Sequence, residues 1–554
     1  MALKVGSTPR SEAAEFETIL AVVPWGELAF LDLEARAERE AVIFPDRRLT
    51  YRAFADEVVH HARCLIAQGI RPGEHVGLLL SNRIEYLVMI SAIACVGGVA
   101  VTINSRYQAS ELAMVIEDSD IVLLITEAQV SDDVDYLERL SRAFPELGGT
   151  ARPDALALAG APKLRRILLL NGEAPHSLCF AAFVAGGETV PAAEVARRRK
   201  LVRIRDPFMM MYTSGTTSSP KGCLLTHESV VRTIQGVATR FALEPDDRYW
   251  TPLPMFHMGS INPFGAVLWT GATFVCLPYF DAGEALAMIE AERATIGFLS
   301  FPPIIAGLAR HPDVKTRDLS SLRALMSNAA VQTPEVKREL LEAFPDVVHT
   351  GMYGMTEGGG AVCCTAVYDS PGAGTRRNGR PMPGMQVRIV RPDGTDADPD
   401  EPGEIWFAGY GLFEGYYKQP EKTAEVFIKG WMHSGDRGSM NEAGEILFMG
   451  RSKDMLKVGG ENVSPGEIEA FLEGHPAVKV CQVIGIADER LTEVAVAVIE
   501  LRPGQTATDA ELIAYCRGNI ASFKVPRQVR FVEDWPFTPS MKIKKSELAS
   551  LFAD

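Results

Sequence analysis

Short runs of almost wholly apolar residues recur through the first half of the chain, and they constrain its fold more than any other feature. The runs 76–80, 121–125 and 208–212 contain no charged side chain, which is typical of strands that are buried on both faces of a sheet. Residues 51–68 and 110–116 instead repeat apolar positions at helical spacing. This alternation of helix and strand patterns predicts parallel α/β sheets.

The longest apolar stretch, residues 87–103, is interrupted by Ser91 and by the pair Gly97-Gly98. It is shorter than the roughly 20 residues that a membrane-spanning helix needs. A buried helix that leads through a turn into a strand is the expected structure. Residues 1–17 also lack the apolar core of a secretion signal, so the sequence predicts a cytoplasmic protein without a membrane span.

Charge and cysteine content limit the partners. The chain has 56 Lys and Arg against 71 Asp and Glu, a net charge of −15, and nucleic-acid binding normally needs a basic face. We therefore expect no nucleic-acid partner, and an anionic substrate must be held by a local group of residues. The 9 cysteines show no Cys-x-x-Cys spacing, which favours reduced, buried thiols over disulfides or a zinc site.

The pattern changes in the last third of the chain. From residue 379 onward Gly and Pro are frequent and apolar residues alternate, as in 404–407, which predicts a small antiparallel barrel or sheet. A charged break at 450–454 follows. Beyond it, 465–473 and 509–520 are expected to be helices, and 478–485 and 493–501 strands. We therefore predict an N-terminal domain over 1–451, with a β-rich part at about 379–451, and a C-terminal α+β domain over 452–554.

The strongest chemical signal is the segment 212–222, Tyr-Thr-Ser-Gly-Thr-Thr-Ser-Ser-Pro-Lys-Gly, directly after an apolar strand pattern. Glycines allow backbone N–H groups to approach phosphate, hydroxyls add donors, and Lys221 adds a positive charge. The spacing is not that of a P-loop NTPase. The alternative is a flexible surface linker, but apolar stretches on both sides favour a phosphate-binding loop.

This loop resembles the phosphate-binding signature of the adenylate-forming enzymes, which include acyl-CoA synthetases, beetle luciferases and peptide-synthetase adenylation domains. Further signatures follow in the same order as in that family: 353–357 (Tyr-Gly-Met-Thr-Glu), 431–436 (Trp-Met-His-Ser-Gly-Asp), 450–454 (Gly-Arg-Ser-Lys-Asp) and 459–462 (Gly-Gly-Glu-Asn). The resemblance implies a large N-terminal domain of two parallel-type α/β subdomains and a small β-barrel, followed by a mobile α+β C-terminal domain. It is strongest to acyl-CoA synthetases of the fatty-acid and crotonobetaine/carnitine–CoA ligase type.

The resemblance also assigns an ATP site. It implies that the loop holds the β- and γ-phosphates, that Thr356 contacts the α-phosphate, that Glu357 holds Mg²⁺, and that Asp436 accepts hydrogen bonds from the ribose with help from Arg451. Phosphoryl transfer needs such donors and cations, because negative charge develops on the phosphoryl oxygens. The implied ATP-binding residues are Thr213, Ser214, Gly215, Thr216, Thr217, Lys221, Asn328, Ala329, Ala330, Tyr353, Asp436 and Arg451.

The C-terminal part is expected to carry residues that change position between the two half-reactions. Lys542 stands where the family has its catalytic lysine, although Met541 replaces the usual preceding Gly, and Lys544 is the alternative. Lys453 corresponds to the hinge about which the C-terminal domain rotates between the two half-reactions. The rotation would bring Gly459 and Gly460 to a tunnel for the pantetheine arm. His257 resembles the aromatic residue that gates this tunnel, the alternative being a core histidine.

The resemblance places the acyl pocket in the segments 255–265, 299–305, 326–332 and 350–361. None contains Lys or Arg, and Glu357 is their single acidic residue. A buried, unpaired charge on the substrate would cost several kcal/mol, so an apolar monocarboxylate is expected. Residues 358–360, three glycines, predict either a wide pocket floor or a flexible turn. The pocket residues expected are Met258, Ser260, Gly351, Met352, Gly354 and Gly359.

The sequence thus predicts an AMP-forming acyl-CoA synthetase, an acid–thiol ligase that uses ATP, Mg²⁺ and coenzyme A and that could act as a homodimer. Two alternatives stay open. One is an acyl-AMP ligase that loads a carrier-protein phosphopantetheine, because the pantetheine arm is common to both thiols. The other is a catalytically silent ligand-binding homologue, which would be expected to have lost Lys221, Glu357 or the C-terminal lysine.

Overall fold

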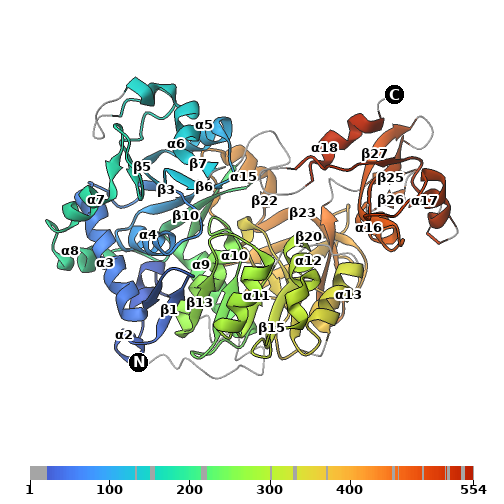
Figure 1. Ribbon diagram of the computed structural model, residues 1–554, viewed down its shortest axis with the longest axis horizontal. Coiled ribbons are helices and arrows are strands. Elements are labelled where there is room, and N and C mark those ends of the chain that lie inside the picture. Colours follow the sequence, from blue (N-terminus) through green and yellow to red (C-terminus); the bar gives the residue numbers. More distant parts are fainter. Residues whose placement is uncertain are drawn as a thin grey trace.

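Two large sheets that share one core make up most of the N-terminal part, and a smaller sheet forms the C-terminal part (Figure 1). The structure is a computed structural model. It describes residues 21–131, 134–149, 156–213, 221–299, 302–328, 334–369, 372–451, 456–458, 461–463, 465–488, 492–517, 519–520, 524–537 and 543–552.

The first sheet has eight strands in the order β21-β11-β10-β4-β3-β5-β8-β9. From β10 to β9 neighbouring strands run parallel, whereas β11 and β21 are antiparallel additions at one edge. The strands are β3 (His75–Leu79), β4 (Val99–Thr102), β5 (Ile121–Thr126), β8 (Arg166–Leu169), β9 (Leu178–Cys179), β10 (Pro207–Thr213), β11 (Lys221–Thr226) and β21 (Gly415–Tyr416).

The second sheet has nine strands in the order β18-β17-β16-β15-β14-β12-β13-β1-β2. The six strands from β16 to β1 are parallel, and antiparallel strands complete both edges. The strands are β1 (Glu40–Ile43), β2 (Arg48–Thr50), β12 (Arg248–Thr251), β13 (Thr273–Cys276), β14 (Ile296–Phe298), β15 (Ala324–Asn328), β16 (Val348–Tyr353), β17 (Cys363–Cys364) and β18 (Arg380–Pro381).

One apolar core joins the two sheets. Because successive side chains of a strand point to opposite faces, Met209 and Met211 of β10 face this core, while Met210 faces a separate core on the outer side. In the other sheet Tyr249 faces the shared core and Trp250 the outer one. The helices that fill the shared core are α3 (Tyr51–Ala67), α4 (Ile84–Cys95), α9 (His227–Arg240) and α10 (Met258–Thr270).

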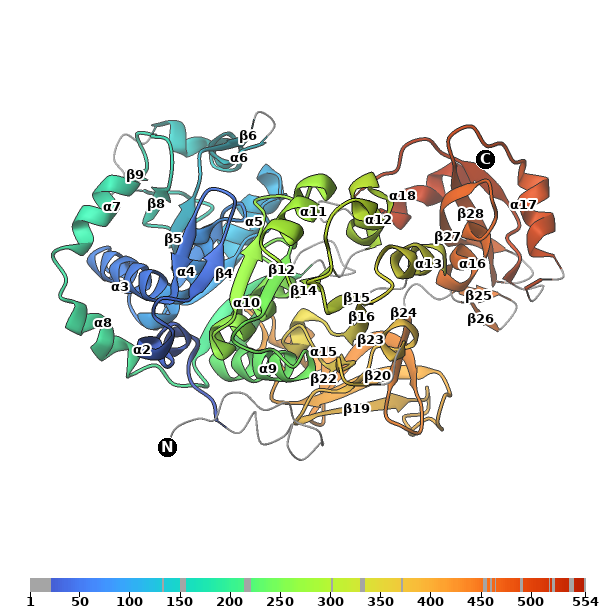
Figure 2. The ribbon, with the colours of Figure 1, turned by 60° about the horizontal axis from the view of Figure 1, so that its bottom comes forward.

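Helices also cover the outer faces, so the N-terminal part alternates helix and sheet layers (Figure 2). Helices α5 (Ala109–Asp118) and α6 (Tyr136–Ala143) cover the eight-stranded sheet, and α11 (Ala282–Ala291), α12 (Pro302–Arg310) and α13 (Pro334–Ala343) the nine-stranded one. Shorter elements are η1 (Trp25–Phe30), α2 (Leu33–Arg36), β6 (Gln129–Ser131), β7 (Val134–Asp135), η2 (Pro145–Gly149), α7 (Phe180–Gly187), α8 (Ala192–Arg199), η3 (Pro312–Lys315), η4 (Thr356–Gly358) and α14 (Ala373–Arg376).

The Gly- and Pro-rich part is a five-stranded antiparallel sheet, β19-β20-β23-β22 with β24 paired to β23. Sequence allowed a barrel or a sheet here, and among the described strands no pairing closes the sheet into a barrel. The elements are β19 (Met385–Val390), β20 (Gly403–Gly409), α15 (Pro420–Val426), β22 (Phe427–Ile428), β23 (Trp431–Met440) and β24 (Ile446–Arg451).

The C-terminal part has a five-stranded sheet with an apolar cluster on each face. Its larger cluster includes Val483 and Ile468, and its smaller one includes Val496 and Leu548. The elements are β25 (Leu456–Val458), β26 (Glu461–Val463), α16 (Pro465–Glu473), β27 (Val478–Asp488), β28 (Thr492–Leu501), α17 (Asp509–Cys516), β29 (Val529–Phe531), α18 (Lys545–Leu548) and η7 (Ala549–Phe552).

The predicted fold class is confirmed as a mixed α/β fold with a large N-terminal part and a smaller C-terminal part. The apolar runs are strands β3, β5 and β10, and the stretch 87–103 is helix α4, a turn and strand β4. The largest boundary error is in the helix expected over 509–520, which ends at Cys516 because Arg517 takes an extended conformation with φ −65° and ψ 129°. Among the described residues no helix is long and apolar enough to cross a membrane.

Candidate active site

The segments in which the sequence placed the acyl pocket follow the carboxyl ends of four strands. Strands β12, β14, β15 and β16 are parallel neighbours, so their carboxyl ends lie along one edge of the nine-stranded sheet. Ligands of open α/β sheets bind at such edges. The segment 255–265 follows β12, and the segment 350–361 spans the end of β16. Residues 300–301 and 329–332 of the other two segments lie outside the described part of the chain.

The predicted phosphate loop connects two paired strands. Strands β10 and β11 form an antiparallel hairpin in which Thr213 lies directly opposite Lys221. The residues between them, 214–220, are outside the described chain, and they include the predicted Ser214, Gly215, Thr216 and Thr217. The two residues that flank the loop, Thr213 and Lys221, therefore lie side by side at the end of β10 and the start of β11.

Glu357 is buried close to this hairpin. It belongs to η4, which directly follows β16, and its residue is 5% exposed. Tyr416 donates its hydroxyl hydrogen to Glu357 Oε1 at 2.8 Å. Burial, and next the charge of Glu357, raise the pKa of the Cys223 thiol well above its usual value, so the thiol stays protonated. Thr356 Oγ1 lies 3.9 Å from Met211 Sδ of β10. The structure thus brings the two motifs together.

Tyr416 and Cys223 were missed by sequence reasoning. Tyr416 also lies beneath Lys221, whose Nζ is 4.7 Å from the centre of the tyrosine ring. Strand β21, which carries Tyr416, pairs with β11 through Cys223 and Leu224. The Gly-Tyr-Tyr sequence around Tyr416 has no periodicity that would predict contact with a residue so far along the chain.

A second buried contact joins Tyr353 to Asp436. The Tyr353 hydroxyl donates to Asp436 Oδ2 at 3.0 Å, and the backbone N–H of Asp436 donates to Ser434 Oγ at 3.0 Å. Burial, and next the Asp436 charge, raise the pKa of Tyr353 well above its usual value, so the hydroxyl remains a donor. Asp436 lies opposite Arg451 in the β23–β24 pair, which places these predicted ATP-binding residues together.

Comparison with known proteins decides the family. Residues 31–417 match the family described as AMP-binding enzyme, and residues 467–542 match that family's C-terminal domain. The chain belongs to the AMP-binding enzyme family. The predicted family is therefore confirmed.

Relatives of this AMP-binding enzyme extend over almost its whole length. YngI of Bacillus subtilis (strain 168), a candidate acyl-CoA synthetase by its name, is 35% identical over 532 residues, which are 94% of this chain and 96% of YngI. The mitochondrial medium-chain acyl-CoA ligase ACSF2 of Macaca fascicularis is 32% identical over 93% of this chain and 85% of its own. The crystal structure of the anthranilate CoA ligase AuaEII with anthranoyl-AMP has a TM-score of 0.81 and 26% identity, covering 96% of this chain and 97% of that one.

These relatives confirm the predicted reaction class, AMP-forming ligation of an acid to coenzyme A. ATP and coenzyme A as substrates, with a small carboxylic acid, are consistent with the family.

The predicted acyl-pocket residues contact different neighbours. Met258 and Gly354 both lie against Gly360: a Cβ atom added to Gly360 would be 2.5 Å from Met258 Cβ, and one added to Gly354 would be 2.4 Å from Gly360 O. Ser260, by contrast, donates to the backbone oxygen of Leu253 at 2.6 Å. The remaining members are Met352, which is 3% exposed, Gly359, whose oxygen accepts from Asn262 Nδ2 at 3.1 Å, and Gly351, where an added Cβ would be 2.3 Å from Arg377 O.

At Gly359 and Gly360 the structure shows a closely packed turn rather than an open floor. Gly359 and Gly360 have φ of +69° and +87°, a region that L side chains rarely adopt. Their backbone packs closely on α9 and α10, since an added Cβ at Gly359 would be 2.8 Å from Thr233 Oγ1. The room that the sequence suggested is filled by these helices.

His257 precedes α10 as its N-terminal flanking residue and is half-buried, with its ring 4.9 Å from that of Phe256. Neither the gating role nor the core role is tested by this placement, so both stay predictions. The backbone of Asn328 ends β15 opposite Gly351. Lys544, the alternative to Lys542, is paired with Glu547 at 3.0 Å. Outside the described residues lie Lys542, Lys453, Gly459, Gly460, Ala329 and Ala330.

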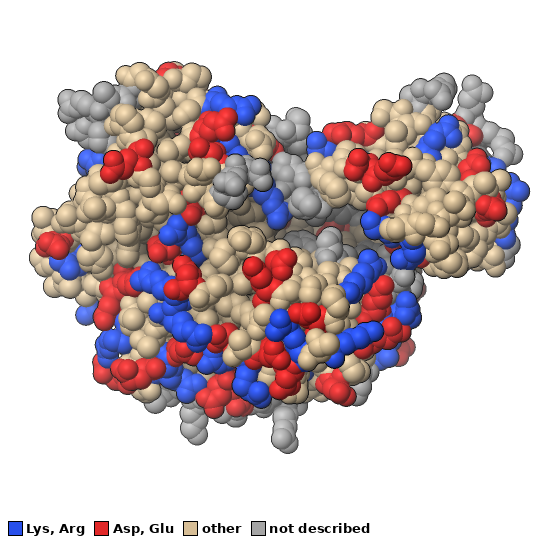
Figure 3. Space-filling view, viewed as in Figure 1, with Lys and Arg blue, Asp and Glu red and all other residues tan. Residues whose placement is uncertain are grey.

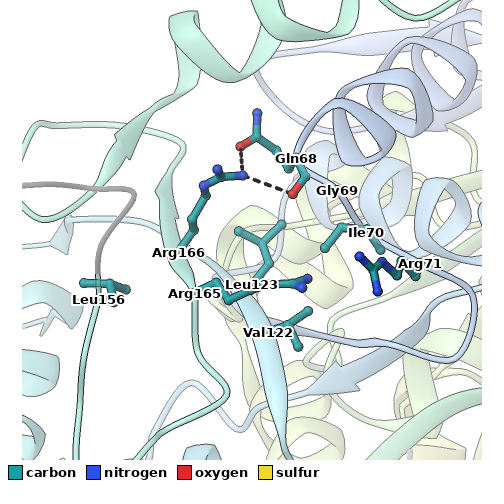
Figure 4. A pocket seen from close by; sticks show the side chains of 9 residues that line it. All are labelled: Gln68, Gly69, Ile70, Arg71, Val122, Leu123, Leu156, Arg165 and Arg166. Carbon is teal, nitrogen blue, oxygen red and sulfur yellow. Dashed lines mark hydrogen bonds between the residues drawn. The ribbon is translucent and has the colours of Figure 1, made fainter.

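A separate pocket of about 310 Å³ lies away from these motifs, near the amino ends of β5 and β8 (Figure 4). Arg166 closes one side of it by donating to Gln68 O and Oε1 at 3.0 and 2.9 Å. None of the predicted site residues lines it. The lining residues are Gln68, Gly69, Ile70, Arg71, Val122, Leu123, Leu156, Arg165 and Arg166.

Proposed function

We propose that this AMP-binding enzyme activates an apolar monocarboxylic acid with ATP and transfers the acyl group to coenzyme A. The observation that carries the proposal is the packing of Thr356 and Glu357 against the β10–β11 hairpin, with Lys221 at the hairpin and Tyr416 between Lys221 and Glu357. That arrangement puts hydroxyls, a cation and a carboxylate within one small region. Such a set suits the triphosphate of ATP with a bound metal ion.

The proposed reaction has two steps. A carboxylate oxygen of the acid first forms a bond to the α-phosphorus of ATP while the bond to pyrophosphate breaks. The sulfur of coenzyme A then forms a bond to the acyl carbon while the bond from that carbon to the AMP oxygen breaks, and AMP and the thiol proton are released. We assign Lys221 and the loop to the β- and γ-phosphates, Thr356 to the α-phosphate, and Lys542 to the charge that develops in the first step.

We assign the ribose to Asp436, with Tyr353 and Arg451 beside it. Asp436 is 4% exposed and already accepts one hydrogen bond, from Tyr353. A carboxylate has several acceptor positions, so ribose hydroxyls could donate to the same group. A buried carboxylate gains most from such donors, because water does not compete for it.

Mg²⁺ fits the residues present. Among the described residues no group of three or more His, Cys, Asp and Glu side chains could hold a metal ion by itself. Mg²⁺ commonly binds through one or two carboxylates together with substrate phosphates, and Glu357 supplies one carboxylate close to the loop. Bound there, the ion would neutralise charge on the phosphate oxygens.

The substrate class rests on the pocket segments. They contain no Lys or Arg, and a second substrate charge buried there would cost several kcal/mol. The relative named as a medium-chain acyl-CoA ligase supports an aliphatic acid.

We further propose a domain boundary between residues 451 and 452, with the β-rich part at about 379–451 and a C-terminal domain over 452–554. This C-terminal domain would turn about Lys453 and carry Gly459 and Gly460 to the thiol tunnel. The separate apolar clusters of the C-terminal sheet and the surface hollow beside it (Figure 3) support a domain that moves as a unit. A cytoplasmic location is supported by the cysteines of the described chain, which form no disulfide, and a homodimer stays a prediction.

The test is a panel of aliphatic, aromatic and alicyclic acids, scored for AMP release with and without coenzyme A. Glu357→Gln serves as the inactive control. We expect apolar monocarboxylates to give AMP release that depends on coenzyme A. We expect amino acids and dicarboxylates to give no AMP release. AMP release from no acid would refute the proposal, and thioester formation with a carrier protein alone would favour the carrier-loading alternative.

A further inference from the structure

Tyr416 touches two groups to which different roles are assigned above. Its hydroxyl donates to Glu357 Oε1 at 2.8 Å, and its ring lies 4.7 Å from Lys221 Nζ. We propose that Tyr416 is a positioning residue that sets the metal-binding carboxylate and the phosphate-binding ammonium group at a fixed separation. This inference rests on the proposed function, since that function gives Glu357 and Lys221 their ligands.

The contact with Glu357 fixes the direction of a buried carboxylate. Glu357 is 5% exposed and Tyr416 is 7% exposed, so water contributes little to holding the carboxylate in place. A hydrogen bond to a charged group is stronger than one between neutral groups. With one oxygen held by Tyr416, the carboxylate has a defined orientation before a metal ion arrives, which lowers the cost of binding that ion.

The contact with Lys221 supports a cation without neutralising it. Among the described residues Lys221 forms no ion pair, and the face of the Tyr416 ring is the support that the structure shows for its ammonium group. An aromatic ring attracts a cation through its quadrupole but carries no net charge. The full positive charge of Lys221 therefore stays available for an anionic phosphate, which a carboxylate partner would have reduced.

The backbone around Tyr416 is anchored independently of its side chain. Tyr417 N–H donates to Gly222 O and Glu414 N–H to Leu224 O, both at 2.8 Å. The next side chain, Tyr417, donates its hydroxyl hydrogen to Asp120 Oδ2 at 2.9 Å. Strand β21 should therefore keep its place when the Tyr416 hydroxyl is removed, so the effect of that removal reports on the hydroxyl itself.

Two substitutions separate the two contacts. Tyr416→Phe keeps the ring beneath Lys221 and removes the donor to Glu357, so it should weaken metal binding. Tyr416→Leu removes both contacts, so it should also reduce the rate at saturating metal. Tyr417→Phe is the matched control, because it deletes the same hydroxyl group from the adjacent residue, where the acceptor is Asp120.

The experiment uses the full chain with Mn²⁺ and a non-hydrolysable ATP analogue, measured by titration calorimetry, together with pyrophosphate exchange as a function of Mg²⁺. We expect Tyr416→Phe to raise the dissociation constant for the Mn²⁺–analogue complex by roughly tenfold, as for loss of a hydrogen bond to a charged group. Raising Mg²⁺ should restore most of its exchange rate, but not that of Tyr416→Leu. Tyr417→Phe should match the wild type in both assays.

Three results would overturn the inference. The first is a Mn²⁺ affinity of Tyr416→Phe equal to that of Tyr417→Phe, and the second is a loss of pyrophosphate exchange in Tyr416→Phe that extra Mg²⁺ does not restore. The third is a full additional loss of Mn²⁺ affinity when Tyr416→Phe is combined with Glu357→Gln. Two residues that act together should instead give effects that do not add. A wild-type chain that binds Mn²⁺ and the analogue but activates no acid would refute the proposed function and leave this inference standing.

Discussion

Acidification should weaken the shared core through His227, the first residue of α9. His227 is 0% exposed, its Nδ1 accepts from the backbone N–H of Trp25 at 3.1 Å, and its ring lies 5.0 Å from that of Phe208 in β10. Burial lowers the pKa of His227 to about 3. The folded chain therefore binds fewer protons here than the unfolded chain, in which the histidine pKa is about 6.5.

The sign and size of the effect follow from this difference. The stabilisation is fully present above the unfolded pKa and is lost as the pH falls below it toward the folded pKa. Between about pH 7.5 and about pH 5.5, His227 should make unfolding about tenfold more favourable, or about 1.4 kcal/mol. Other histidines act in the same direction, because burial also lowers the pKa of His61, to about 4, and of His75, His176, His349 and His433.

A variant isolates the contribution of His227. His227→Asn keeps an acceptor for the Trp25 N–H but cannot be protonated in this range. In urea unfolding followed by tryptophan fluorescence, the factor by which its unfolding equilibrium constant rises between the two pH values should be about tenfold smaller than in the wild type. His60→Asn, at a histidine that is only partly buried, is the control. Equal losses in the wild type and in His227→Asn would refute the reasoning.

Three further predictions concern the reaction. Lys542→Ala should abolish pyrophosphate exchange yet still transfer a supplied acyl-AMP to coenzyme A; an exchange rate equal to that of the wild type would contradict the role of Lys542. Lys453→Pro should keep pyrophosphate exchange and lose thioester formation, and equal loss of both activities would contradict the hinge. Gly360→Ala should destabilise the fold and raise KM for the acid, because its Cβ would lie 2.5 Å from Met258 Cβ at a φ of +87°; unchanged melting temperature and KM would show that the neighbours move aside easily.

Much of the sheet architecture was predictable because its strands are buried on both faces. Strand β10 reads Pro-Phe-Met-Met-Met-Tyr-Thr, and every residue from Phe208 to Tyr212 is buried, so its apolar run marks the strand without any knowledge of its partners. Helix α16 of the C-terminal part matched its predicted bounds because Pro465 sets its first turn. The end of α17 was misplaced because the prediction carried the helix past Gly518, a residue that commonly marks a helix end, whereas Arg517 already leaves the helix.

The candidate site was predictable only as a set of motifs. The sequence identifies the loop with Lys221 and the segment with Glu357, but the residue that joins them, Tyr416, belongs to a two-residue strand whose pairing depends on tertiary packing. Likewise, the glycines at 358–360 indicate an unusual backbone, but they do not show that Thr233 and Met258 fill the space beside it.

The two large sheets end in very short strands. Strands β21, β9 and β18 have 2 residues each, and β2 has 3. A long unpaired edge would expose a row of backbone N–H and C=O groups that could recruit another chain. Since these edges offer almost no such row, sheet extension between molecules is disfavoured during folding and at high concentration. If two copies associate through either of these large sheets, their contact should therefore use helix or loop surfaces rather than a continuous intermolecular sheet.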